Sequence, residues 1–316
     1  MDLQTKILLS KQQHNQIDYQ SKIVLLGSCF AEHITDKFTY FKFREFKNPF
    51  GILFHPLAIE NLISNSINKK VYTKADVFLH NEQWHCFEAH SKLSDSSKEH
   101  LLFNLNTNVK QTLKHLNEAT HLIITLGTAW AYRYIESDKY VANCHKVPQK
   151  KFLKELLSPK TILASLDRMI TLLKSINPEV SILFTVSPIR HVKDGFVENT
   201  LSKSHLITAI HQVVDSRHQL YYFPSYEIMM DELRDYRFYD EDMLHPNQTA
   251  INYIWNAFKK VWISSEAQLT MTEIDAIQKG LLHRPFNPNS EAHQAFLQKL
   301  TKKQVEIQSI HKHIRF

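Results

Sequence analysis

The sequence predicts an α/β fold, a sandwich of helices around a mostly parallel β-sheet, with a helical appendage at its carboxyl end. Two observations predict this fold. Short apolar segments rich in β-branched or aromatic residues recur along the chain, and each ends at a Gly, Ser or Pro. Segments with helical periodicity alternate with them, which is typical of parallel strands whose sheet is covered by helices on both faces.

Four segments are predicted to be buried strands of this sheet. They are residues 23–26, 121–126, 180–186 and 220–223. Ligands of open parallel sheets bind beyond the carboxyl ends of the strands. The residues that follow these four segments are therefore the first candidates for a functional site.

Helices are predicted between and after the strands. They cover residues 30–41, 56–67, 100–118, 161–176, 201–217 and 248–261. In segment 201–217, Leu206, Ile210 and Val213 fall on one apolar stripe at helical spacing. Such a stripe indicates a helix that packs on the sheet.

Two segments interrupt the alternation, and a third follows it. Residues 71–93 alternate apolar and polar side chains, which predicts an inserted β-hairpin, and residues 132–147 predict a second, shorter hairpin. After the last helix of the sandwich, two more helices are predicted at 272–282 and 290–311. We therefore expect one domain over residues 1–264 and a helical extension over residues 265–316.

Composition excludes several classes of protein. The chain has 316 residues, of which 43% are hydrophobic and 22% charged, as in globular proteins rather than collagen-like or disordered chains. No apolar run approaches the roughly 18 residues of a membrane helix, so no membrane span is expected. The first residues lack the pattern of a secretory signal, which predicts a cytoplasmic location. Three widely spaced cysteines without a CxxC pair predict reduced thiols.

The net charge of +6 does not by itself indicate a nucleic-acid partner. Half of the excess lies in residues 290–316, from Lys299, Lys302, Lys303, Lys312 and Arg315 against Glu291 and Glu306. No recognised nucleic-acid motif accompanies the charge. We therefore expect no nucleic-acid partner.

Ser28 is the first candidate for chemistry, because it follows a predicted strand and opens a predicted helix. The positive end of the helix dipole and its free N–H groups favour a developing anion at such a serine. Serine is also a preferred N-cap residue, so a purely structural role stays open.

A serine nucleophile needs a base, and His245 with Asp242 is the candidate pair. An aspartate three residues before a histidine on a tight turn can hold one imidazole nitrogen while the other faces the serine. A second pair with this spacing, Asp215 and His218, ends a predicted helix just before a strand. It therefore lies at the opposite edge of the sheet.

Arg190 and His191 follow a predicted strand and thus lie at the same edge as Ser28. Both are expected to bind substrate, and the arginine would bind a carboxylate or phosphate group of it. The alternative is a structural ion pair with Asp194 or Glu198. Cys29 follows the serine, and we expect it to be a buried thiol that packs behind Ser28 without a catalytic role.

Histidines and cysteines are too irregularly spaced to predict a metal site. The relevant residues are His80, His85, Cys86, His90, Cys144 and His145, and they show no recognised four-ligand spacing. We expect neither a metal nor another cofactor.

Residues 27–31, Gly-Ser-Cys-Phe-Ala, are the five-letter signature of the GSCFA family, which resembles the SGNH (GDSL-like) hydrolases. The resemblance covers about residues 20–260, and segments 48–51, 125–130, 187–191 and 242–246 follow in the expected order. It implies a three-layer α/β/α sandwich with a flavodoxin-like sheet. It also implies that Ser28 is the nucleophile, His245 the base and Asp242 the residue that orients it.

The same resemblance implies an oxyanion hole that is incomplete in this chain. SGNH enzymes use the backbone N–H of the serine, that of a glycine in a second block, and an asparagine side chain in a third. By position these are Ser28 and Gly51, while residues 127–130 stand where a Gly-x-Asn-Asp block belongs and contain no asparagine. Either the hydroxyl of Thr128 or the indole N–H of Trp130 is expected to replace it, with Trp130 also placed to bind substrate. Loss of one such donor costs about 100- to 1,000-fold in turnover.

The sequence thus predicts a serine-dependent esterase or O-acyltransferase with a Ser-His-Asp catalytic triad. Its substrate would be a small-molecule or carbohydrate O-acyl ester, by analogy with the family. The alternative is a catalytically weak or inactive binding or scaffold module with the same fold, suggested by the missing asparagine and the basic helical extension. An exposed apolar stripe on residues 290–311 would favour a partner or a homodimer through these helices. Its predicted members are Phe296, Leu297, Leu300, Ile307 and Ile310.

Overall fold

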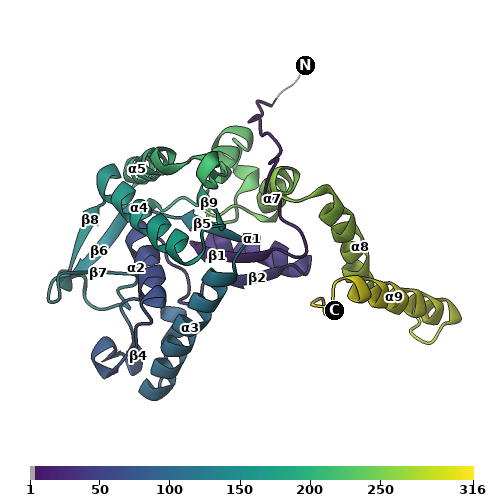
Figure 1. Ribbon diagram of the computed structural model, residues 1–316, viewed down its shortest axis with the longest axis horizontal. Coiled ribbons are helices and arrows are strands. Elements are labelled where there is room, and N and C mark those ends of the chain that lie inside the picture. Colours follow the sequence, from purple (N-terminus) through teal and green to yellow (C-terminus); the bar gives the residue numbers. More distant parts are fainter. Residues whose placement is uncertain (1–3) are drawn as a thin grey trace.

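The computed structural model describes residues 4–316 and confirms the predicted α/β architecture (Figure 1). Its central sheet has five strands within this range, all paired in parallel. In chain order they are β1 (Lys22–Gly27), β2 (Arg44–Lys47), β5 (His121–Leu126), β9 (Ser181–Val186) and β10 (Leu220–Tyr222). Their spatial order is β10-β9-β5-β1-β2. Numbered by themselves the strands follow the order 2-1-3-4-5, which is that of flavodoxin-like sheets.

Helices cover both faces of this sheet, as Figure 1 shows. The helices on one face are α2 (Pro56–Ile67), α3 (Lys98–Glu118), α4 (Pro159–Ile176) and α5 (Phe196–Val213), and those on the other are α1 (Cys29–Tyr40) and α7 (Gln248–Trp262). Neighbouring side chains of a strand point to opposite faces, so β1 contributes to two separate cores. Val24 and Leu26 join the cluster under α2 to α5, whereas Ile23 and Leu25 join the cluster under α1 and α7. Two cores around one sheet give the arrangement of a three-layer sandwich.

Shorter elements complete the part of the chain that the structure describes. Short 3₁₀ helices lie at Lys74–Asp76, Ser91–Leu93, Gln149–Lys151, Val192–Asp194, Ser216–His218 and Tyr236–Phe238. The three-residue α6 (Ser225–Glu227) leads into a π-helical turn, Ile228–Glu232. The predicted helix at 201–217 is wrong at both ends, because α5 begins at Phe196 and ends at Val213. Val214 adopts an extended conformation there and the chain turns at once toward β10.

Both predicted hairpins are present, although neither has the predicted extent. The first consists of β3 (Phe78–His80) and β4 (Gln83–His85), with loops and 3₁₀ turns in the rest of residues 71–93. The second, β6 (Trp130–Tyr134) and β7 (Lys139–Val141), gains a third strand, β8 (Phe152–Leu156), which pairs with β6. This small antiparallel sheet stands beside the main one in Figure 1.

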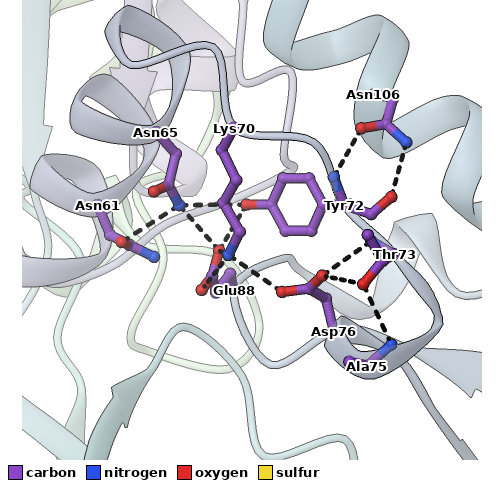
Figure 2. A network of polar contacts seen from close by, with 9 residues as sticks. All are labelled: Asn61, Asn65, Lys70, Tyr72, Thr73, Ala75, Asp76, Glu88 and Asn106. Atoms are coloured by element: carbon purple, nitrogen blue, oxygen red, sulfur yellow. Dashed lines mark hydrogen bonds and ion pairs between the residues drawn. The ribbon is translucent and has the colours of Figure 1, made fainter.

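A network of polar contacts attaches the inserted segment to α2 and α3 (Figure 2). The carboxylate of Glu88 accepts hydrogen bonds from Lys70, Tyr72 and Asn65. The backbone of Tyr72 pairs with the side-chain amide of Asn106 on α3 through two hydrogen bonds. Because the segment contains little regular structure, these side chains fix its position.

The carboxyl end forms an arm of two helices, α8 (Ser265–Leu281) and α9 (Glu291–Ile310), and α9 projects from the body of the molecule in Figure 1. The predicted apolar stripe on α9 is divided between two environments. Leu300 and Ile307 are buried, whereas Phe296, Leu297 and Ile310 are exposed to at least a third. No helix among residues 4–316 is long and apolar enough to cross a membrane.

Candidate active site

The candidate site lies at the carboxyl edge of the sheet, where β1 and β5 are neighbours. Ser28 directly follows β1, and Gly127 directly follows β5. The backbone N–H of Ser28 donates to the carbonyl oxygen of Thr125 at 3.0 Å, which holds the two strand ends together. In a sheet of this order, the crossovers change direction between these two strands, and ligands bind at that point.

The hydroxyl group of Ser28 is buried without a hydrogen-bond partner anywhere in residues 4–316. Ser28 occupies the N-cap position of α1, but its side chain does not cap the helix. In contrast, the serines that precede α3, α4, α8 and α9 all accept a hydrogen bond from a backbone N–H three residues later. A buried polar group without a partner costs about 1–3 kcal/mol. The exception at α1 therefore needs an explanation other than capping.

Asp242 holds His245 in a defined orientation. One carboxylate oxygen of Asp242 accepts from the backbone N–H groups of Leu244 and His245, and the other lies 2.5 Å from His245 Nδ1. Hydrogen bonds from these two backbone groups and from the imidazole lower the pKa of Asp242 to about 2. An ionised carboxylate only accepts, so Nδ1 carries the ring proton and Nε2 is left as an acceptor.

The loop that carries His245 meets the loop that follows β9 at the edge where Ser28 lies. The backbone N–H of Arg190 donates to the carbonyl oxygen of Leu244 at 3.3 Å. No hydrogen bond joins Ser28 Oγ to His245 in the described chain. Such bonds are often long in free enzymes and shorten when substrate binds.

The three groups predicted to form the oxyanion hole already have partners. The N–H of Ser28 bonds to Thr125, and the N–H of Gly51 donates to the carbonyl oxygen of Asn48 at 2.8 Å. The hydroxyl of Thr128 is bonded to that of Ser202 and accepts from the backbone N–H of Trp130. The indole N–H of Trp130, the predicted alternative to Thr128, differs from these three groups, because it is buried without a partner in the described residues.

A cleft of about 480 Å³ adjoins Ser28 on the side of the small antiparallel sheet. Its size is that of a small-molecule site. Phe54 and His191 line this cleft and also lie around Gly127, next to Ser28. The rest of the lining includes three aromatic side chains, three lysines and one acidic side chain among small, polar and aliphatic residues. These are Trp130, Tyr132 and Phe152, Lys146, Lys154 and Lys193, and Asp194. Lys154 pairs with Asp194, which leaves an excess of positive charge in the cleft.

Arg190 and His191, the predicted substrate-binding residues, have different surroundings. Burial raises the pKa of Tyr226 and of Tyr239, and the positive charge of Arg190 opposes this rise at both hydroxyl groups. Asp194, one predicted ion-pair partner of Arg190, pairs with Lys154 instead. Burial lowers the pKa of His191 to about 4, with further contributions from Lys203 and His245.

Lys203 is a part of the site that the sequence analysis missed. It lies on α5, is fully buried, and its ammonium group donates to the carbonyl oxygens of Gly127 and Ser187, both at 2.7 Å. Burial lowers its pKa to about 7. The sequence did contain an indication of this role. Lys203 lies at helical spacing from Leu206 and Ile210 on the apolar stripe of α5, so its side chain faces the core, and a buried lysine is rare unless it has partners.

Cys29 packs against the apolar cluster under α1, and burial raises the pKa of its thiol. A protonated thiol is a poor nucleophile. The rings of His85 and His145 lie 4.7 Å apart, but each bonds to a backbone carbonyl oxygen through Nε2. Within residues 4–316, no group of three or more His, Cys, Asp or Glu side chains is arranged to hold a metal ion.

The fold and the site together define a class of α/β protein, with a flavodoxin-like sheet and a buried serine and a His-Asp pair at its carboxyl edge. The family model "GSCFA family" matches residues 22–258, and the chain belongs to this family, as its signature predicts. The model "GSCFA domain protein, C-terminal domain" matches residues 274–316. No curated protein matches the chain. The resemblance to SGNH hydrolases and the division at residue 264 stay predictions.

Proposed function

We propose that this protein is a serine-dependent ester hydrolase or O-acyltransferase in which Ser28, His245 and Asp242 form the catalytic triad. One observation carries the proposal. The hydroxyl of Ser28 is buried at the amino end of α1 and bonds to nothing in the described chain, although other helices of this protein use the equivalent hydroxyl as a cap. A buried polar group without a partner needs an explanation, and a catalytic role accounts for this one because Ser28 lies at the carboxyl edge of the sheet, where ligands bind.

The reaction follows from the three side chains. Ser28 Oγ attacks the ester carbonyl carbon while His245 Nε2 takes its proton, and Asp242 stabilises the imidazolium that forms. The amino end of α1 favours the negative charge that develops. When the C–O bond to the leaving group breaks, His245 returns the proton to the leaving alkoxide. Water or an acceptor hydroxyl then releases the acyl group by the same steps.

The cleft beside Ser28 supports a ring-shaped, anionic ester as the substrate class. Aromatic side chains from β6 and β8, Trp130 and Phe152, form an apolar surface on which a sugar or another ring can lie. Lys146 and Lys193 add positive charge that favours a carboxylate or phosphate on the same molecule. An O-acylated small molecule or carbohydrate with an acidic group fits both features.

The test is covalent labelling with a fluorophosphonate probe, which reacts with activated serines. We expect wild type and Cys29→Ala to be labelled, and Ser28→Ala and His245→Ala to be unlabelled. Asp242→Asn is expected to be labelled far more slowly, because the amide does not stabilise an imidazolium. Circular dichroism of each variant shows whether it is folded. Equal labelling of wild type and Ser28→Ala would refute the assignment of the nucleophile.

A binding or scaffold module is the second candidate, and one observation favours it. The predicted donors at Ser28, Gly51 and Thr128 are all bonded within the chain. Folded wild type that no probe labels and that hydrolyses no ester would support this candidate. A homodimer through α8 and α9 and a cytoplasmic location stay predictions under either function.

A further inference from the structure

We propose that His191 is a catalytic residue, and that its Nε2–H group donates the side-chain hydrogen bond to the oxyanion formed when Ser28 attacks. The inference rests on the proposed ester chemistry and adds a residue to it. His191 was expected only to bind substrate. Its place in the structure assigns it to the reacting oxygen instead.

Ser28 and His191 lie on the same side of Gly127. A Cβ atom added to Gly127 would lie 3.2 Å from Ser28 Cβ, 3.2 Å from the carbonyl oxygen of Phe54 and 3.6 Å from His191 Nε2. The nucleophile and the ring nitrogen are therefore near each other, and Gly127 has no side chain to separate them. An oxygen on the carbon that Ser28 attacks can then come within hydrogen-bond distance of Nε2.

His191 Nε2 is free to serve as this donor. It is buried and has no hydrogen-bond partner within residues 4–316. Ala129 occupies the position that the resemblance assigns to asparagine, and its methyl group cannot donate. Of the two predicted replacements, Thr128 bonds to Ser202, and the indole of Trp130 is not among the three atoms nearest to the Cβ position of Gly127. The imidazole supplies the hydrogen bond that these positions lack.

The ring of His191 is held in place before any substrate binds. Its backbone N–H donates to the side-chain oxygen of Asn199 at 2.9 Å. Its ring packs edge-on against that of Phe54, with centroids 5.7 Å apart and planes at 81°. A donor fixed in this way stabilises an oxyanion without a reorganisation cost at the moment of reaction.

Electrostatics separates the roles of the two histidines. Burial lowers the pKa of His191 to about 4, against a smaller opposing effect of Asp194, so its ring is neutral at pH 7, and within residues 4–316 its Nε2 bonds to no carboxylate. His245 has the carboxylate of Asp242 to stabilise its charged form. His245 is therefore suited to take a proton, whereas neutral His191 is suited to donate a hydrogen bond from Nε2 without losing its proton.

The step balances with these two residues. The Ser28 Oγ–carbon bond forms as the π electrons of the carbonyl group move to its oxygen, and the proton of Oγ passes to His245. The resulting oxyanion accepts the hydrogen bond from His191. When the carbonyl re-forms, the bond to the leaving alkoxide breaks, and that alkoxide takes the proton from His245.

The experiment compares His191→Phe with His191→Gln on 4-nitrophenyl acetate. Phenylalanine keeps a ring but has no donor, so we expect kcat to fall about 100-fold with KM within about twofold. Glutamine retains an N–H donor and is expected to restore kcat to within about tenfold of wild type. Binding of a trifluoromethyl ketone, whose adduct carries the oxyanion, should weaken in parallel with kcat. A structural role would change KM and folding together without this rescue.

The other outcomes are distinct. Active wild type together with an equally active His191→Phe refutes the role of His191 and leaves the proposed function in place. A loss of kcat in Trp130→Phe but not in His191→Phe would assign the donor to the indole. Folded wild type that neither turns over the ester nor reacts with a fluorophosphonate refutes the proposed function, and the role of His191 with it.

Discussion

Replacement of Ser28 by alanine is expected to stabilise the folded protein while it removes activity. The hydroxyl group of Ser28 is buried and has no hydrogen-bond partner in the described chain. In the unfolded chain the same hydroxyl bonds to water, so folding loses a hydrogen bond at this residue. Alanine has no hydroxyl and avoids this loss.

The size of the effect follows from two terms. Removal of a buried polar atom without a partner recovers about 1–3 kcal/mol. Loss of a serine N-cap costs about 1 kcal/mol, but only where the side chain makes the capping bond. Ser28 makes no such bond, so the second term is nearly absent. We expect a gain of about 1–2 kcal/mol in the free energy of unfolding.

Urea unfolding followed by tryptophan fluorescence measures this gain. Ser158→Ala is the matched control, because the hydroxyl of Ser158 accepts a hydrogen bond from the backbone N–H of Thr161 at 3.1 Å. The control should lose about 1 kcal/mol, so the two serine-to-alanine changes are expected to have opposite signs. If Ser28→Ala loses as much stability as Ser158→Ala, the hydroxyl of Ser28 has a structural partner and the argument for an unpaired nucleophile is wrong.

Three further predictions concern the rest of the structure. Burial lowers the pKa of His55 to about 4 from 6.5, so its contribution to stability is present above pH 6.5 and is lost as the pH falls toward 4. Urea unfolding should therefore show that the free energy of unfolding falls less steeply between pH 6.5 and 4 in His55→Asn than in wild type, by about 1.4 kcal/mol per pH unit. Equal pH dependence in the two proteins would contradict the lowered pKa of His55. Glu88→Gln weakens the contacts with Lys70 and should cost about 1–2 kcal/mol in urea unfolding, whereas Glu82→Gln on the exposed turn should cost almost nothing. Trp130→Phe keeps the ring and removes the indole N–H in the cleft, so steady-state kinetics should show a KM raised several-fold at an unchanged kcat. An unchanged KM would exclude a substrate contact at this nitrogen.

Local patterns in the sequence predicted four of the five strands of the sheet and missed the strand at one edge. Strand β5 has the predicted bounds, because a buried strand is apolar along its whole length. Strand β2 was missed, since its sequence Arg-Glu-Phe-Lys has three charged residues and shows neither apolar alternation nor a breaker. It pairs with β1 and forms the edge of the sheet, so charged side chains are tolerated there.

In the candidate site, too, the sequence predicted contacts between residues that are close in the chain but not those between distant residues. The contact of Asp242 with His245 depends on a three-residue turn, which is visible in the sequence. The bond of Thr128 to Ser202 joins residues 74 positions apart, and no local pattern contains it. A prediction from motifs can therefore place the Thr128 hydroxyl at the correct edge of the sheet and still miss that this hydroxyl is already bonded to Ser202.

The buried ammonium group of Lys203 has a consequence for how substrate range can diverge within the family. It joins the carbonyl oxygens of Gly127 and Ser187, and thereby ties the loops after β5 and β9 to α5. A substitution in either loop that moves its carbonyl leaves a buried cation unsatisfied, and selection removes such changes. Tyr132 and Lys154 line the cleft from β6 and β8 and take no part in these two bonds, and Lys154 pairs instead with Asp194 of the same cleft. Evolutionary change in specificity should therefore accumulate in the small antiparallel sheet, while the chemistry beneath it stays constant.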